Sequence, residues 1–162
     1  METFMPDTQT LISILKQEQI LRLRHCKLLE AQGRALLACD RARFGKLEPD
    51  HADLLVQMAA QETARQSALT DEDGEMQTLS AILEEIEENS RARRTLTMLR
   101  DTLRETVERS RILMQRNEML IRNELNYLAF SLDLFVEAGR AAGQSYGGGA
   151  ILGPRLGLDR RA

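Results

Sequence analysis

Apolar side chains recur at α-helical spacing along most of this chain, and this repeat limits the fold more than any other feature. Ile14, Leu21, Leu28 and Ala35 each lie seven residues apart, the spacing of a seam in a helical bundle or coiled coil. The chain has only three prolines, and it is rich in the helix formers Leu, Glu, Arg, Gln and Ala. We therefore predict an all-α protein: an antiparallel three-helix bundle or coiled coil with one long C-terminal helix and a flexible glycine-rich tail.

Turn-forming residues divide the repeat into three expected helices. Gly45 is suited to end the first helix, and Pro49 is suited to the first turn of the second. The expected helices cover about residues 8–44, 49–68 and 74–140. Between Glu87 and Thr95 almost every residue is polar, so the third segment either crosses solvent there or breaks, and the pattern leaves both alternatives open.

The expected domain organisation is a single helical domain over residues 1–142, followed by a flexible tail over residues 143–162. Seven of the ten glycines occur from Gly139 onward, together with Pro154. Such a composition does not hold a helix or bury much surface.

Composition narrows the function classes. The chain carries 25 acidic and 22 basic residues, a net charge of −3, which gives no electrostatic footprint for nucleic acid. We expect no membrane insertion, because no apolar run approaches 18 residues. The first ten residues, METFMPDTQT, lack the basic and apolar regions of a signal peptide, so we expect a cytoplasmic protein.

Residues suited to catalysis or metal binding are sparse. The chain has two histidines, His25 and His51, and Glu48 with His51 forms a single Glu-x-x-His spacing. A di-metal bundle needs that motif on two helices, so we expect no metal, no cofactor and no enzymatic activity. Cys26 and Cys39 both fall on the first expected helix, too far apart for a disulfide.

The stretch from Gln115 to Val136 differs from the rest of the chain, because its apolar residues form two faces on a helical wheel. One face consists of Ile121, Leu125, Leu128, Leu132 and Val136, and the roughly opposite face consists of Leu120, Tyr127, Phe130 and Leu134. The first face continues a seam formed earlier in the same helix by Leu96, Leu99, Leu103, Val107 and Met114, so we expect it to hold the bundle together. For the second face two alternatives remain: it is internal, covered by the other helices or a second subunit, or it receives a partner helix.

These residues carry a family resemblance. The sequence N-E-M-L-I-x-N-x-L-x-Y from Asn117 to Tyr127, in a long C-terminal helix, resembles the FlgN-type flagellar export chaperones. The Tyr-Gly turn followed by glycine, from Tyr146 to Gly149, adds to the likeness, as do the chain length and the helical layout.

The resemblance implies a cytoplasmic type III export chaperone without enzymatic activity. Such a chaperone binds the helical termini of the flagellar hook-filament junction proteins, prevents their premature assembly and delivers them to the export gate. The cargo residues that it implies here, together with the spare apolar face, are Asn117, Leu120, Ile121, Tyr127, Phe130 and Leu134. Tyr146 matches the family's tyrosine for docking to the export-gate platform. The alternative is a generic coiled-coil adaptor or structural protein that homodimerises through the same apolar faces.

Overall fold

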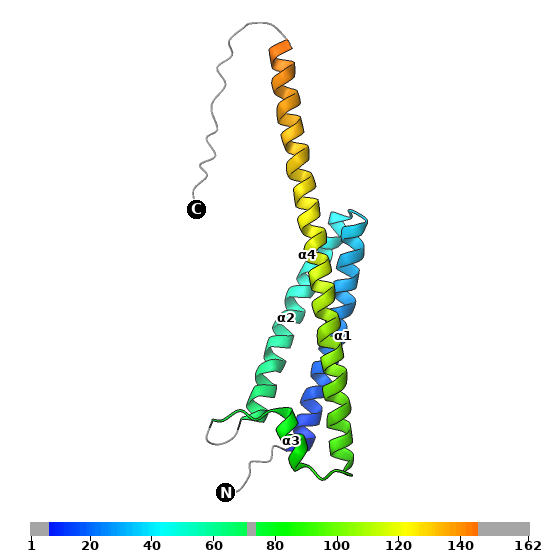
Figure 1. The fold of residues 1–162 in the computed structure, drawn as a ribbon, viewed down its shortest axis with the longest axis vertical. Coiled ribbons are helices and arrows are strands. Elements are labelled where there is room, and N and C mark those ends of the chain that lie inside the picture. Colours follow the sequence, from blue (N-terminus) through cyan, green and yellow to red (C-terminus); the bar gives the residue numbers. More distant parts are fainter. Residues whose placement is uncertain (1–6, 71–73, 146–162) are drawn as a thin grey trace. The chain divides into compact units, whose positions relative to one another are not determined.

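The computed structural model describes residues 7–70 and 74–145, and these residues form helices joined by short connections (Figure 1). The helices are α1 (Thr8–Leu37), α2 (Arg41–Leu69), α3 (Leu79–Glu85) and α4 (Arg91–Ser145). The predicted all-α class is confirmed. Contacts within the chain separate two units, Met1–Arg122 and Asn123–Ala162, and each is described by itself.

The first helix ends earlier than predicted. The N–H of Cys39 donates to the carbonyl of Leu36 (3.0 Å) and that of Asp40 to the carbonyl of Ala35 (2.9 Å), which is a Schellman motif with Cys39 in the left-handed conformation at φ 53°. The carboxylate of Asp40 then accepts from the N–H of Arg43 (2.9 Å) and caps α2. The prediction that the break falls at Gly45 is therefore wrong, because Asp40 supplies an N-cap before the glycine is reached.

Gly45 and Pro49 both lie inside α2. A proline in a helix lacks the N–H that would bond the carbonyl four residues earlier, and its ring crowds that carbonyl. The helix nevertheless continues through Pro49, which the sequence pattern had placed at its start.

The predicted third helix is also interrupted. Ile86 has an extended backbone, and Ser90 Oγ accepts from the N–H of Arg93 (3.1 Å), as an N-cap does. Arg93 reaches back to donate to the carbonyl of Ile86 (3.0 Å). The alternative of a break in the Glu87–Thr95 stretch is thus the one observed, and the helices on either side are α3 and α4.

The core of the first unit gathers apolar side chains from all four helices. It consists of Leu11, Ile12, Leu15, Leu69, Ile82, Leu83, Ile86, Leu96, Leu99 and Leu103. The predicted seam is confirmed at Leu96, Leu99 and Leu103, but Val107 and Met114, which continue the same repeat, are exposed. The continuous core therefore ends near Leu103.

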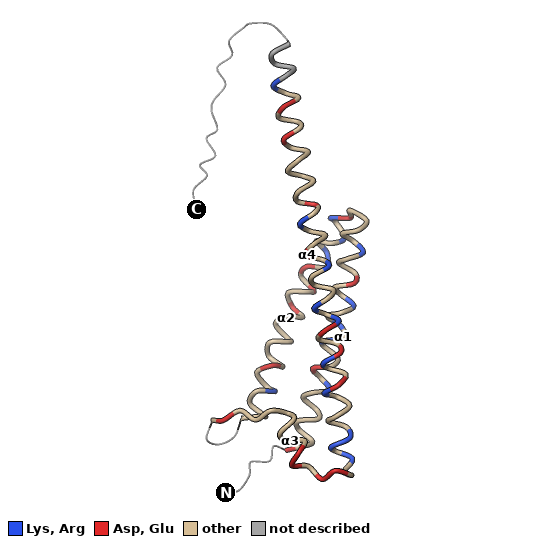
Figure 2. Tube along the Cα trace, in the orientation of Figure 1, with Lys and Arg blue, Asp and Glu red and all other residues tan. Residues whose placement is uncertain are grey.

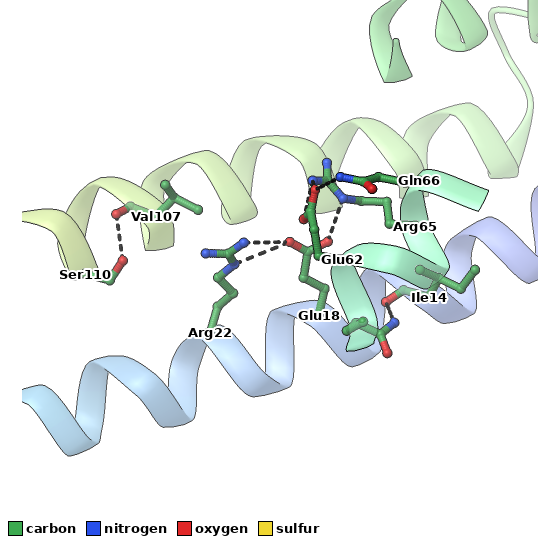
Figure 3. A network of polar contacts seen from close by, with 9 residues as sticks. Ile14, Glu18, Arg22, Glu62, Arg65, Gln66, Val107 and Ser110 are labelled. Atoms are coloured by element: carbon green, nitrogen blue, oxygen red, sulfur yellow. Dashed lines mark hydrogen bonds and ion pairs between the residues drawn. The ribbon is translucent and has the colours of Figure 1, made fainter. Parts of the chain in front are cut away.

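A buried carboxylate ties α1 to α2 (Figure 3). Glu18 is 6% exposed, and its oxygens pair with Arg22 on the same helix (3.1 Å) and with Arg65 on α2 (3.2 Å). The buried Glu18 carboxylate thus has two cationic partners. Arg65 also pairs with Glu62. Removing one partner of such a group leaves a poorly compensated charge, so this cluster fixes how the two helices meet.

Charged residues are spread along the first unit with both signs interspersed (Figure 2). In α4 the pattern changes, since no charged residue occurs between Glu124 and Asp133. Among the described residues, no helix is long and apolar enough to cross a bilayer.

Candidate partner-binding surface

The part of α4 in the second unit exposes an unusual amount of apolar surface. Eight large side chains between residues 125 and 136 are exposed, with exposed fractions from 39% to 76%: Leu125, Tyr127, Leu128, Phe130, Leu132, Leu134, Phe135 and Val136. Isolated exposed apolar residues are ordinary on protein surfaces, whereas so many on one stretch of helix make it a candidate interaction site.

These side chains fall into two groups on the helix. We call Tyr127, Phe130 and Leu134 the Tyr127 face, and all three are exposed as a partner-binding role requires. We call the opposite set the Leu128 face, which consists of Leu125, Leu128, Leu132, Phe135 and Val136.

The prediction that the Leu128 side of the helix holds the bundle together is wrong. Every member of the Leu128 face is exposed, and Phe135, which was not singled out from the sequence, is the most exposed at 76%. The physical reason lies within the second unit, Asn123–Ala162, whose described residues form no helix other than the end of α4, so no second described helix of this unit covers the face.

Leu120 and Ile121, two further predicted cargo residues, lie in the first unit. Leu120 is half-buried and Ile121 is 37% exposed. Ile121 lines an open pocket of about 300 Å³, whose other apolar walls are Leu29, Phe44 and Met114. Ile121 is thus accessible to a partner, and Leu120 less so.

Asn117, the remaining predicted cargo residue, is buried between α4 and α1. Its Nδ2 donates to the carbonyl of Leu29 (2.8 Å), and its Oδ1 lies only 2.6 Å from where a Cβ on Gly33 would be. The side chain therefore packs the two helices together, and in this structure it is not presented to a partner. The absence of a side chain at Gly33 is what permits this approach.

Sequence reasoning missed a polar chain in the first unit that joins His25 to His51. Gln32 Nε2 is 2.7 Å from Glu48 Oε1 and 3.2 Å from His51 Nδ1, and the Nε2 atoms of the two histidines are 3.2 Å apart. Because the Gln32 amide nitrogen donates both its protons, His51 carries its proton on Nε2 and donates it to His25. The ring centroids lie 5.2 Å apart, and the two ring planes are inclined by 25°.

The surroundings of His25 favour its neutral form. Burial, followed by the nearby His51 and Arg22, lowers the pKa of His25. A second proton on the His25 ring would place its N–H against the N–H of His51. The individual histidines were visible in the sequence, but their pairing depends on how α1 and α2 pack, which no local pattern shows.

Tyr146, the predicted export-gate residue, lies outside the described residues, as does most of the predicted tail. The helix α4 itself extends to Ser145, five residues past its predicted end at 140. Within the part of the chain that the structure describes, no group of three or more His, Cys, Asp or Glu side chains is arranged to hold a metal ion.

Comparison with known protein families gives one match. The family model described as FlgN protein matches residues 1–150, which is most of the chain. Comparisons with curated proteins and with solved structures found no match. Because the match covers all four helices, the chain belongs to the FlgN family of flagellar export chaperones.

Proposed function

We propose that this chain is a cytoplasmic type III export chaperone for flagellar hook-filament junction proteins. It binds their helical termini, prevents premature assembly and delivers them to the export gate, without catalysing a reaction. The observation that carries this proposal is the exposed apolar surface of α4 between Leu125 and Val136. An amphipathic helix that covers such a surface removes it from water, which is the main driving force for helix-in-groove recognition.

The Tyr127 face is the proposed cargo site. Ile121 does not belong to it, because it lies on the opposite side of the helix. Asn117 does not belong to it, because its amide is used in packing α4 against α1. Export-gate docking is assigned to Tyr146 on the family resemblance alone.

The experiment is a calorimetric titration of the full chain with each purified junction protein from the same organism. Replacing Tyr127, Phe130 and Leu134 together by Ser is expected to lower the affinity by at least about tenfold, while circular dichroism shows that the helical content is retained. Val56 and Met98 are exposed apolar residues elsewhere in the chain, so their double replacement by Ser is the matched control. Binding that survives the triple change unaltered contradicts the proposed site.

The alternative is an adaptor or structural protein that homodimerises through the same faces. This alternative predicts that the chain alone forms a stable dimer, which light scattering would detect. It also predicts that the same triple replacement dissociates that dimer. A monomer that binds a junction protein excludes it.

The Tyr127 face alone is small for a stable complex. Burying a large apolar side chain contributes about 1.5–3 kcal/mol when it starts fully exposed, so three partly exposed ones supply roughly 3–5 kcal/mol. A micromolar complex requires about 8 kcal/mol net of association costs. This difference in free energy favours a partner that covers more of α4 than one face.

A further inference from the structure

The buried side of α4 changes character at Leu103, within the first unit. Up to this residue the apolar side chains that α4 buries are Leu96, Leu99 and Leu103, and all three belong to the apolar core. Beyond it, among the side chains of α4 that the structure describes, the buried ones are polar: Thr106, Ser110 and Asn117. The helix is continuous through both parts, but the core holds only the first of them.

The polar positions continue the seam of the helix. Ser110 and Asn117 follow Leu103 at intervals of seven residues, where a coiled coil ordinarily carries apolar side chains, and a polar residue at such a position lowers the stability of the contact. The hydroxyl groups of Thr106 and Ser110 donate to carbonyls of α4 itself, at 2.7 and 2.8 Å. Neither hydroxyl is therefore used to bond α1.

Two of the contacts that do join this part of α4 to α1 are weak. The thiol of Cys26 donates to the carbonyl of Thr106 over 3.6 Å, and a thiol is a poor donor. Arg109 pairs with Glu30, but Arg109 is exposed, and an ion pair in solvent contributes little to stability.

Asn117 makes the strongest bond to α1, and it is incompletely satisfied. Its Nδ2 donates to the carbonyl of Leu29 (2.8 Å), whereas its Oδ1 is buried without a hydrogen-bond partner among the described residues. A buried acceptor without a partner costs free energy, which offsets part of the gain from the bond. The apolar seam positions on either side, Leu113 and Leu120, are only half-buried.

We propose that residues 106–122 of α4, which we call the strap, open from α1 while the apolar core stays intact. The core fixes α4 up to Leu103, so the strap forms a separate unit of lower stability. Its opening uncovers Cys26 and Leu29 on α1, which are 1% and 2% exposed in the closed structure. This device lies within the first unit and is independent of what the chain binds.

Thiol labelling of the full chain with DTNB detects this opening. The chain has two cysteines, of which Cys39 is exposed and Cys26 is buried. We expect a fast phase from Cys39 and a slow phase from Cys26, and the slow phase is absent from the Cys26→Ser variant. Where the slow rate is proportional to the reagent concentration, its ratio to the rate for the urea-unfolded chain gives the equilibrium constant of opening.

The urea dependence of the slow phase separates local opening from global unfolding. We expect Cys26 to be labelled at least about tenfold faster than global unfolding permits. We also expect its opening to depend only weakly on urea below the unfolding transition, because opening the strap exposes little surface. A slow phase whose rate and urea dependence match those of global unfolding overturns the inference.

A matched pair of variants tests which helix moves. Asn117→Leu places an apolar side chain in the seam and removes the unpartnered oxygen, so it is expected to slow the labelling of Cys26 by at least about tenfold. Gln61 of α2 also donates its amide N–H to an α1 carbonyl, that of Ile14, at 2.8 Å, and Gln61→Leu is expected to leave the labelling rate unchanged. A rate that Asn117→Leu does not slow overturns the inference, as does an equal response to both variants.

Discussion

The contact between Gly33 and Asn117 predicts that a helix-favouring substitution in α1 destabilises the protein. Gly→Ala in a helix interior ordinarily stabilises by about 1 kcal/mol. At position 33, however, the new Cβ would lie 2.6 Å from Asn117 Oδ1, so the amide must move and lose its 2.8 Å bond to the Leu29 carbonyl. A buried amide left without its partner costs about 1–3 kcal/mol, and the forced repacking adds about 1–3 kcal/mol.

These two costs, less the helix gain of about 1 kcal/mol, give a net destabilisation of about 1–5 kcal/mol for Gly33→Ala. In an Asn117→Ala background the obstacle is gone, and Gly33→Ala is then expected to stabilise by about 1 kcal/mol. The sign of the same substitution thus reverses between the two backgrounds. The assay is urea unfolding of the four proteins of this cycle, followed by circular dichroism.

Gly45→Ala supplies the matched control, because Gly45 also lies inside a helix but has nothing within 4 Å of its Cβ position. It is expected to stabilise by about 1 kcal/mol in either background. A Gly33→Ala variant that is stabilised like Gly45→Ala when Asn117 is present would refute the close packing of α4 on α1.

Three further predictions concern single positions. Cys39→Gly is expected to raise the free energy of unfolding by about 1 kcal/mol, because Cys39 adopts a left-handed conformation at φ 53° that glycine enters without strain; an unfolding midpoint that falls contradicts this. Because the folded pKa of His25 lies below its unfolded value of about 6.5, the unfolded chain binds more protons below that pH. The contribution of His25 to the free energy of unfolding is therefore complete above about pH 6.5. It declines as the pH falls, by at most about 1.4 kcal/mol per pH unit. His25→Asn is expected to flatten this decline when the free energy of unfolding is measured across the same pH range. An unchanged slope would assign the decline to other titratable groups. Tyr146→Ala is expected to leave junction-protein binding intact but to weaken docking to the isolated export-gate platform, and equal docking by both proteins excludes the assignment.

The sequence predicted the parts of the fold that depend on local chemistry. Apolar periodicity identified the helices and the buried Leu96, Leu99 and Leu103. It also identified the exposed Tyr127 face, which remains the proposed cargo site. The first boundary failed where two local signals competed, because Asp40 caps α2 before Gly45 is reached. In the third segment, the cap supplied by Ser90 decides between the two alternatives that the pattern had left open.

The sequence could not predict the features that depend on which helices pack against each other. Periodicity shows which residues share a face, but not whether another helix is long enough to cover it, so the Leu128 face was assigned to the core. Asn117 held a signal that was not used: a polar residue at a seam position, one turn before Ile121, often bonds across the interface. Its partner, the Leu29 carbonyl opposite Gly33, could only be found from the packed structure.

Hydrogen–deuterium exchange of the full chain with and without a purified junction protein tests the central claim most directly. The amides of α4 between Asn123 and Arg140 lie in a helix whose side chains are mostly exposed, so their exchange is governed by local opening. The account predicts that the junction protein slows exchange strongly in this stretch and leaves the α1–α2 contact around Glu18 and Arg65 unchanged. Protection confined to α1 and α2, with no change between Asn123 and Arg140, would contradict it.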